Sequence, residues 1–197
     1  STQYVYQNYP KWQNYKTYKP FTKYGESKVI GEKEVINKCK NPYLILRPTN
    51  IWGEGNMIYL NGLFKIMDRG IYFHPNKLYV LRSYGYVRNI CYQTIKLMES
   101  ESINKIYYIS DRPIDLLKFV TYIQKEINFK PIKILPVWFF KINGFIGDIL
   151  TKLKIPYPLN TIRVSNMIKS NPVPIEDTIK ITGESPYTLF ESIKNTI

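Results

Sequence analysis

A tyrosine and a lysine stand four residues apart in the segment KYGESKVIGEKEV, at Tyr24 and Lys28. On a helix, residues at i and i+4 project from the same face, one turn apart. A phenol has a pKa of about 10, too high for it to be a useful base near neutral pH. An ammonium group within a few ångströms favours the phenolate and lowers that pKa. The pair could therefore move a proton, although the same spacing also suits a packed tyrosine beside a solvated lysine.

The elements that must position this pair alternate between strand-like and helix-like segments. Apolar or β-prone runs predict strands at 1–6, 43–53 (stopped by Pro48), 105–110 and 131–136, and the segment 77–87 is predicted to be extended. Helical periodicity predicts helices at 22–39, 58–70, 87–100, 113–127 (with Pro113 near its start) and 185–197, and the apolar run 134–150 predicts a buried or partly exposed helix. Strands that alternate with helices predict an α/β fold with a parallel sheet.

The charge of the chain sets limits on its partners. The 197 residues carry a formal charge of +13, which raises the possibility of nucleic-acid binding. However, 22 lysines against 6 arginines are spread along the chain, and no arginine-rich cluster is interleaved with aromatic residues. We therefore expect no nucleic-acid partner. A basic surface would still attract an anionic substrate such as a nucleotide diphosphate.

Cysteine and histidine usage argues against a metal site. Cys39 and Cys91 are far apart, and His74 is the only histidine, so no familiar zinc-binding pattern is present. Unpaired, widely spaced cysteines are typical of reduced thiols in a cytosol-like compartment. The most apolar run, 134–150, is interrupted by charged residues and is too short to span a bilayer. We therefore expect a cytoplasmic protein without a membrane span or a metal, with His74 in a packing or surface role.

Four sequence blocks, taken in order, resemble a known family. They are STQYVY (1–6), YGESK (24–28), RPTNIWG (47–53) and RSYGYV (82–87). Their order and spacing resemble the second half of an extended short-chain dehydrogenase/reductase, and most of all the NAD-dependent epimerase/dehydratase family in its nucleotide-sugar branch. The resemblance implies a doubly wound, Rossmann-like parallel sheet. It implies the C-terminal half of the NAD-binding domain over 1–110, with an active-site helix at 22–39, and a mostly helical substrate-binding region over 111–197.

The resemblance also implies which residues perform the chemistry. The family's catalytic set matches Thr2, Tyr24 and Lys28. In the family the tyrosine exchanges a proton with the substrate hydroxyl, and the threonine hydrogen-bonds the same oxygen. The lysine holds the nicotinamide ribose and lowers the tyrosine pKa. Gly25 and Ser27 would then be small because cofactor and substrate pass close to that face of the helix.

The binding residues are implied in the same way. The segment after the strand lies beside the nicotinamide in relatives, so the cofactor-binding set becomes Tyr24, Lys28, Pro48 and Thr49, for NAD or NADP. Asn50 matches a position that hydrogen-bonds the substrate diphosphate, although a structural asparagine in a turn is the alternative. Arg82 matches a position that places an arginine fork on the substrate phosphates. The alternative is that Arg82 is a surface arginine on an extended segment and binds no ligand.

Departures from the family pattern narrow the function. The glycine-rich dinucleotide fingerprint is absent, and the GEG at 53–55 lacks the third glycine, since Ile58 stands there. We therefore expect a fragment or processed chain whose N-terminal Rossmann half is upstream or in trans. Gln3 and Tyr4 replace the Asp-Glu pair of sugar dehydratases, which disfavours dehydration.

The predicted function is an NAD(P)-dependent epimerase or keto-reductase acting on a nucleotide sugar, of the kind used in polysaccharide biosynthesis, with a homodimer possible. Two alternatives stay open. The chain could be a non-catalytic remnant, or one half of a split protein kept as a binding or assembly module. It could instead be a hydroxysteroid-type dehydrogenase of the same fold, which would need an apolar substrate pocket.

Overall fold

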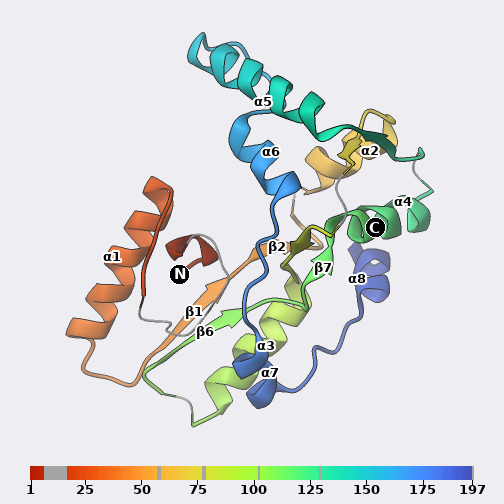
Figure 1. Ribbon diagram of the computed structural model, residues 1–197. Coiled ribbons are helices and arrows are strands. Elements are labelled where there is room, and N and C mark those ends of the chain that lie inside the picture. The colour runs from red at the N-terminus through yellow and green to blue at the C-terminus, as the bar shows by residue number, and fades with distance from the viewer. Residues whose placement is uncertain (7–16, 57–58, 77–78, 102, 129, 197) are drawn as a thin grey trace. The chain divides into compact units, whose positions relative to one another are not determined.

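The computed structural model describes residues 1–6, 17–56, 59–76, 79–101, 103–128 and 130–196 (Figure 1). The chain forms two compact units, each assembled from separate stretches of sequence. The first unit contains Ser1–Asn56, Ser83–Pro113 and Pro172–Ile197, and the second contains Met57–Arg82 and Ile114–Asn171. Both units take segments from either side of residue 110. The division into a nucleotide-binding region and a substrate-binding region at that residue stays a prediction.

The first unit is built on two pairs of parallel strands (Figure 1). β1 (Leu44–Pro48) pairs with β6 (Lys105–Ile109), and β2 (Asn50–Trp52) pairs with β5 (Tyr84–Tyr86). The helical elements of this unit are η1 (Gln3–Val5), α1 (Lys23–Lys38), α3 (Val87–Glu99), α7 (Glu176–Thr182) and α8 (Leu189–Thr196). The parallel pairing confirms the predicted mixed α/β class. In the run 43–53, β1 ends at Pro48, where the predicted strand stops, and the short strand β2 follows after Thr49.

Strand β6 is the centre of the core of the first unit. Four of its five residues are buried, as expected of a strand covered on both faces. Successive side chains of a strand point to opposite faces, so Tyr107 and Ile109 pack against Leu97 of α3. Tyr108 points the other way and packs against Val173, in the segment that precedes α7.

The second unit is mostly helical. β3 (Phe73–Pro75) pairs in parallel with β8 (Lys133–Leu135), and β4 (Leu81–Arg82) pairs antiparallel with β7 (Ile114–Asp115). Its helices are the π-type helix η2 (Tyr59–Phe64), α2 (Lys65–Asp68), α4 (Leu116–Glu126), α5 (Val137–Lys152) and α6 (Thr161–Ile168). The predicted extended segment 77–87 contains β4 and β5, and its residues 77–78 lie outside the described part of the chain.

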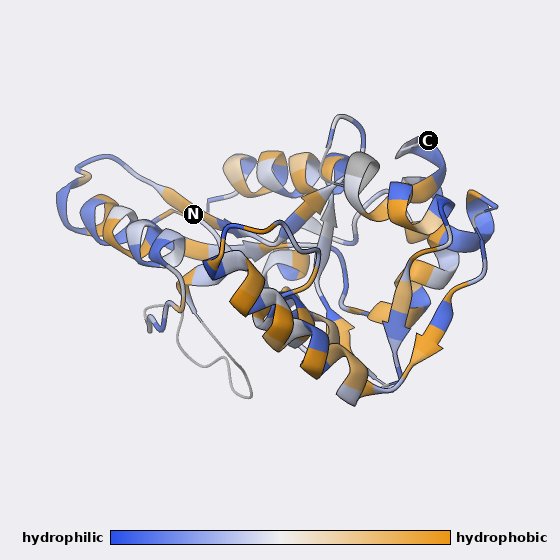
Figure 2. Cartoon of the chain, turned by 90° about the horizontal axis from the view of Figure 1, so that it is seen from above, coloured by the Kyte–Doolittle hydropathy of each residue, from blue (hydrophilic) through white to orange (hydrophobic). Residues whose placement is uncertain are grey.

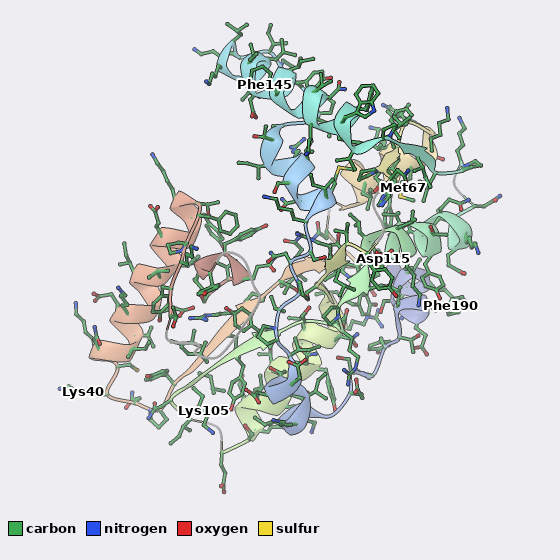
Figure 3. The ribbon with its side chains drawn as sticks, viewed as in Figure 1. Lys40, Met67, Lys105, Asp115, Phe145 and Phe190 are labelled. Atoms are coloured by element: carbon green, nitrogen blue, oxygen red, sulfur yellow. The ribbon has the colours of Figure 1, made fainter. Side chains whose placement is uncertain are left out.

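Three predicted elements differ from the structure for local reasons. The run 1–6 is a 3-10 turn and not a strand, because Thr2 caps it and only Tyr6 forms a bridge, with Lys19. The helix predicted from residue 113 begins at Leu116, since the Asp115 side chain accepts a hydrogen bond from the Lys118 amide and caps it (Figure 3). The apolar run at 134–150 starts as β8, and its helix begins only after Pro136.

Candidate active site

Helix α1 presents the tyrosine and lysine of the opening motif in its first two turns. The helix begins at Lys23 because the Thr22 side chain accepts a hydrogen bond from the Gly25 amide, at 3.0 Å. Tyr24 is 54% exposed, and the Lys28 ammonium lies over its ring, 5.4 Å from the ring centroid. Neither the Tyr24 hydroxyl nor the Lys28 ammonium forms a hydrogen bond or ion pair within the described part of the chain. Both groups are therefore available to a ligand.

Gly25 allows a close approach between α1 and η1. A Cβ atom at Gly25 would collide with the carbonyl oxygen of Tyr4, which lies directly against the helix. The glycine is therefore needed for packing within the protein, a role separate from the one that the resemblance implies for it. The Ser27 hydroxyl donates a hydrogen bond to the Tyr24 carbonyl at 2.8 Å, which holds it against its own helix.

A Gly25→Ala substitution tests this contact. We expect it to lower the free energy of unfolding by about 1–3 kcal/mol, because η1 must shift, even though alanine favours helix more than glycine does. Urea unfolding of the purified variant measures the effect. Gly31→Ala in the same helix is the matched control, since nothing lies within 4 Å of its added Cβ. The control should be neutral or more stable, by up to about 1 kcal/mol. Equal effects of the two variants would contradict the packing role of Gly25.

The turn η1 brings Tyr4 against the catalytic candidates. Thr2 is buried, and its hydroxyl accepts a hydrogen bond from the Tyr4 amide at 3.4 Å. The Tyr4 ring meets the Tyr24 ring edge-on, with 6.4 Å between the centroids. The Tyr4 hydroxyl lies 3.5 Å from Oδ1 of Asn50, and Gln3 donates to the same oxygen at 3.4 Å. Sequence reasoning considered Tyr4 only as a departure from the dehydratase pattern and missed that it touches both Tyr24 and Asn50.

The residues after β1 are held by the sheet. Pro48 is opposite Ile109 in the register of β1 and β6. Thr49 is buried, and its hydroxyl donates a hydrogen bond to the Ser110 hydroxyl at 3.1 Å. Asn50 begins β2, opposite Tyr84. Pro48 ends β1, and Thr49 and Asn50 follow it, so all three lie at the carboxyl end of a parallel strand, where ligands bind in open α/β sheets.

Arg82 belongs to the second unit, on strand β4. It is 6% exposed and pairs with Ile114 across the antiparallel ladder. Among the described residues no side chain forms an ion pair with Arg82. A guanidinium that is removed from water without a counter-charge is costly, so an anion would be a favourable partner for it.

A buried ion pair anchors α1 to β1. Glu32 is one turn beyond Lys28, and Arg47 lies inside β1; they are 3% and 0% exposed. Arg47 Nε donates to Oε1 of Glu32 at 2.8 Å and Nη2 donates to Oε2 at 2.7 Å, which is the bidentate geometry. Arg47 Nη1 donates to the Tyr108 hydroxyl at 3.0 Å, and the guanidinium carbon lies 5.4 Å from the ring centroid of Tyr18 and 5.3 Å from that of Tyr108.

Burial and hydrogen bonding shift the pKa values of Glu32 and Tyr108. Burial opposes ionisation of Glu32, but the hydrogen bonds from Arg47 and from the Ser1 hydroxyl outweigh it and hold the pKa of Glu32 below its ordinary value. Burial raises the pKa of Tyr108 to about 12, so its hydroxyl stays protonated. Sequence reasoning missed this pair. An arginine within the apolar run YLILRP was its one visible signal.

The GEG turn at 53–55 packs against the start of α3, and side chains there fill the space beside Gly53. A Cβ at Gly53, whose φ is +129°, would approach Val87 and Tyr86 to 2.8 and 3.0 Å. The Glu54 carboxylate accepts a hydrogen bond from the Tyr86 hydroxyl at 2.9 Å and pairs with Arg88 at 2.7 Å. A carboxylate in this turn would repel a phosphate.

The remaining titratable candidates form no metal cluster. His74 is buried, with Nδ1 3.1 Å from the Tyr72 hydroxyl, and burial lowers the pKa of His74. Cys39 and Cys91 are exposed free thiols. Within the described ranges no group of three or more histidine, cysteine, aspartate and glutamate side chains is placed to hold a metal ion.

Comparison with solved structures establishes the fold. UDP-glucuronic acid 4-epimerase from Bacillus cereus, in complex with UDP-glucuronic acid and NAD, is 17% identical with a TM-score of 0.69, over 100% of this chain and 58% of that one. RMD from Pseudomonas aeruginosa, complexed with NADPH, is 12% identical with a TM-score of 0.67, over 100% and 63%. A UDP-galactose 4-epimerase is 18% identical with a TM-score of 0.61, over 100% and 59%.

The chain thus has a mixed α/β, Rossmann-like fold shared with these three proteins, and it spans about three fifths of their length. No family model matches the sequence, and comparison with curated proteins gives no match.

Proposed function

We propose that this chain is the catalytic and substrate-binding part of an NAD(P)-dependent epimerase or keto-reductase for a nucleotide sugar. The observation that carries the proposal is the Tyr24–Lys28 pair. Neither polar group has a hydrogen-bond or ion-pair partner among the described residues, and both lie at the start of a helix anchored to the sheet. Two of the structural neighbours named above were solved with ligands, one with NADPH and the other with UDP-glucuronic acid and NAD, which supports the same ligand classes here.

The residues present fit a dinucleotide at its nicotinamide end. The Lys28 ammonium forms no ion pair with a described residue and can donate to ribose hydroxyls. Pro48 and Thr49 would line the same side, at the carboxyl end of β1. When bound, the cofactor would accept and return a hydride. The protein's own residues bind, orient and move the proton.

The proton step is assigned to Tyr24. Its hydroxyl is exposed and unpaired within the described residues, so a sugar hydroxyl can reach it. Tyr24 would take the proton from that hydroxyl as the carbonyl forms and return it in the reverse step. Lys28, whose ammonium lies over the Tyr24 ring, would place a positive charge beside the tyrosine and the bound cofactor. The Thr2 hydroxyl would donate a hydrogen bond to the same sugar oxygen.

Two residues, each in its own unit, are proposed to bind phosphate groups of the substrate: Asn50 in the first unit and Arg82 in the second. Asn50 carries a side-chain amide whose oxygen is contacted by Tyr4 and Gln3, which leaves its amide N–H groups for an acceptor. Arg82 carries an unpaired guanidinium among the described residues, suited to a phosphate in fork geometry. The apolar pocket needed by a hydroxysteroid-type dehydrogenase would leave such an arginine without a counter-charge.

Activity assays on the full-length protein test the proposal. With NAD or NADP present, we expect interconversion of a UDP-sugar, or reduction of a keto sugar nucleotide, followed by chromatography of the sugar nucleotides. Oxidation of a steroid alcohol, with no turnover of any nucleotide sugar, would instead support the hydroxysteroid-type alternative. Absence of both turnover and cofactor binding would support a non-catalytic binding or assembly module.

Arg82→Gln separates binding from chemistry. A phosphate that does not react is bound equally in the ground and transition states, so its loss raises KM more than it lowers kcat. We expect KM for the nucleotide sugar to rise roughly 10- to 100-fold, as for loss of a charge-assisted hydrogen bond worth about 1.5–3 kcal/mol. Steady-state kinetics provide the measurement. Arg88→Gln is the control, because Arg88 pairs with Glu54 and not with the proposed ligand. A collapse of kcat at constant KM would overturn the assignment of Arg82.

A further inference from the structure

Helix α5 of the second unit packs through one face of small and buried residues. Phe140, Gly144 and Gly147 are its buried positions, spaced to share one side of the helix. A Cβ at Gly144 would lie 3.0 Å from Val164 of α6, and a Cβ at Gly147 would collide with the Leu159 carbonyl. This inner face is therefore fully used by contacts with α6 and the segment that leads into it.

The opposite face of α5 carries large apolar side chains that are exposed. We call this set the outer row of α5: Trp138, Ile142, Phe145 and Ile149, which are 62%, 52%, 63% and 45% exposed. Their spacing of i, i+4, i+7 and i+11 places them in one line along the helix. Figure 3 labels Phe145 on α5, and Figure 2 shows hydrophobic residues recurring along this helix. Leu153 and Ile155, 64% and 48% exposed, continue the apolar surface beyond it.

An exposed apolar row of this length on a surface helix indicates that another molecule binds there. A surface helix of a globular protein is ordinarily apolar on the face that meets the core and polar on the other. Contiguous exposed apolar patches mark protein or membrane interaction sites. The charge around the outer row indicates which of the two applies.

Basic residues flank the outer row without neutralisation. Lys141, Lys152 and Lys154 are exposed, and none of them forms an ion pair with a described residue. The acidic residue of α5, Asp148, accepts hydrogen bonds from the amide and hydroxyl of Thr161, at the start of α6. The stretches of the second unit contain 13 lysines and arginines against 4 aspartates and glutamates, a net charge of +9 out of the +13 of the whole chain.

We propose that the outer row of α5 binds the surface of an anionic lipid bilayer. The apolar side chains enter the boundary between headgroups and acyl chains, and the lysines lie on the lipid phosphates while their stems cover apolar surface. α5 has 16 residues, and no described helix is long and apolar enough to cross a membrane, so the helix lies in the plane of the interface. A second copy of the chain is a poorer occupant, because two units of charge +9 repel each other. This inference is independent of the proposed enzymatic function.

Vesicle binding of the purified protein tests the proposal. We expect co-sedimentation with vesicles of phosphatidylcholine containing phosphatidylserine, and roughly tenfold weaker binding to phosphatidylcholine alone or at high salt. The triple variant Ile142→Ser, Phe145→Ser, Ile149→Ser keeps the charge and should bind anionic vesicles at least about tenfold more weakly. The matched control is Ile95→Ser with Met98→Ser on α3, two exposed apolar side chains of the first unit, which should bind like the unchanged protein.

Tryptophan fluorescence supplies a second readout at the same surface. Trp138 is exposed, so its emission should shift to shorter wavelength on addition of anionic vesicles, and Trp138→Phe should remove that shift. Undiminished vesicle binding by the triple serine variant would overturn the proposal, since charge alone would then explain binding. Absence of vesicle binding, together with a dimer that the triple variant dissociates in sedimentation velocity, would also overturn it and assign the row to a second copy.

Discussion

Turnover by the full-length protein should fall by about 10²- to 10⁴-fold when Tyr24 becomes phenylalanine, the range typical of lost general acid–base catalysis. The ring still lies under Lys28 and edge-on to Tyr4, because neither contact uses the hydroxyl. Folding and cofactor affinity should therefore stay nearly unchanged. The measurement is kcat for the nucleotide sugar, with cofactor affinity determined by calorimetric titration and folding by urea unfolding.

Two companion variants distinguish the roles within this site. Lys28→Met should reduce turnover at least as much as Tyr24→Phe and should weaken cofactor binding as well, because it removes the ammonium assigned to the ribose. Thr2→Val should cost less, since it deletes one hydrogen bond at nearly constant shape, typically worth about 0.5–1.5 kcal/mol. If Tyr24→Phe kept near wild-type activity, the pair would be a packed tyrosine beside a lysine, and the proposed mechanism would fail.

Sequence reasoning predicted those elements whose signal is local. Helix α3 follows from its amphipathic period, and it extends over Val87–Glu99 within the predicted 87–100. Helix α1 lies within the predicted 22–39, and the Thr22 side chain caps its start. The strand predicted at 1–6 was wrong because a short β-prone run forms a strand only when another strand pairs with it. Here Thr2 caps a 3-10 turn instead.

Sequence patterns could not predict contacts between segments that are distant along the chain. The packing role of Gly25 could not be predicted, because the Tyr4 carbonyl that lies against it is 21 positions away in sequence. Tyr4 was undervalued for the same reason, since its ring meets Tyr24 only when η1 packs on α1. The sequence predicted the outer row of α5 only in part. The apolar run indicated a buried or partly exposed helix, but the packing of α5 on α6 decides which face of the helix stays exposed.

The Glu32–Arg47 pair is the largest stability effect that we expect in the chain. Arg47→Met removes the guanidinium and leaves the Glu32 carboxylate buried without its bidentate partner. It also leaves the Tyr108 hydroxyl without the donor it now has at 3.0 Å. Breaking one side of a buried pair typically costs about 3–5 kcal/mol. Urea unfolding at pH 7 should show this loss, whereas Lys38→Met, which breaks an exposed pair on the same helix, should change stability little.

A double variant and a pH series separate pairing from packing. Glu32→Leu with Arg47→Met removes both charges, and it should recover most of the stability because no charge is left buried. The pKa of Glu32 lies below its ordinary value of 4.5 in the folded chain, so the pair's contribution is present above that pH. It is lost as pH falls through the folded pKa. The unchanged protein should lose this contribution on acidification, and the double variant should not.

The outcome also bears on the site, because Glu32 is one turn beyond Lys28 on the helix that presents Tyr24. A double variant as stable as the unchanged protein but with reduced kcat would show that the pair positions α1 for catalysis. Stability and kcat both retained would show that apolar packing of α1 on β1 is sufficient. If Arg47→Met alone left stability within about 0.5 kcal/mol of the unchanged protein, as surface substitutions do, the buried pair would not be an anchor at all.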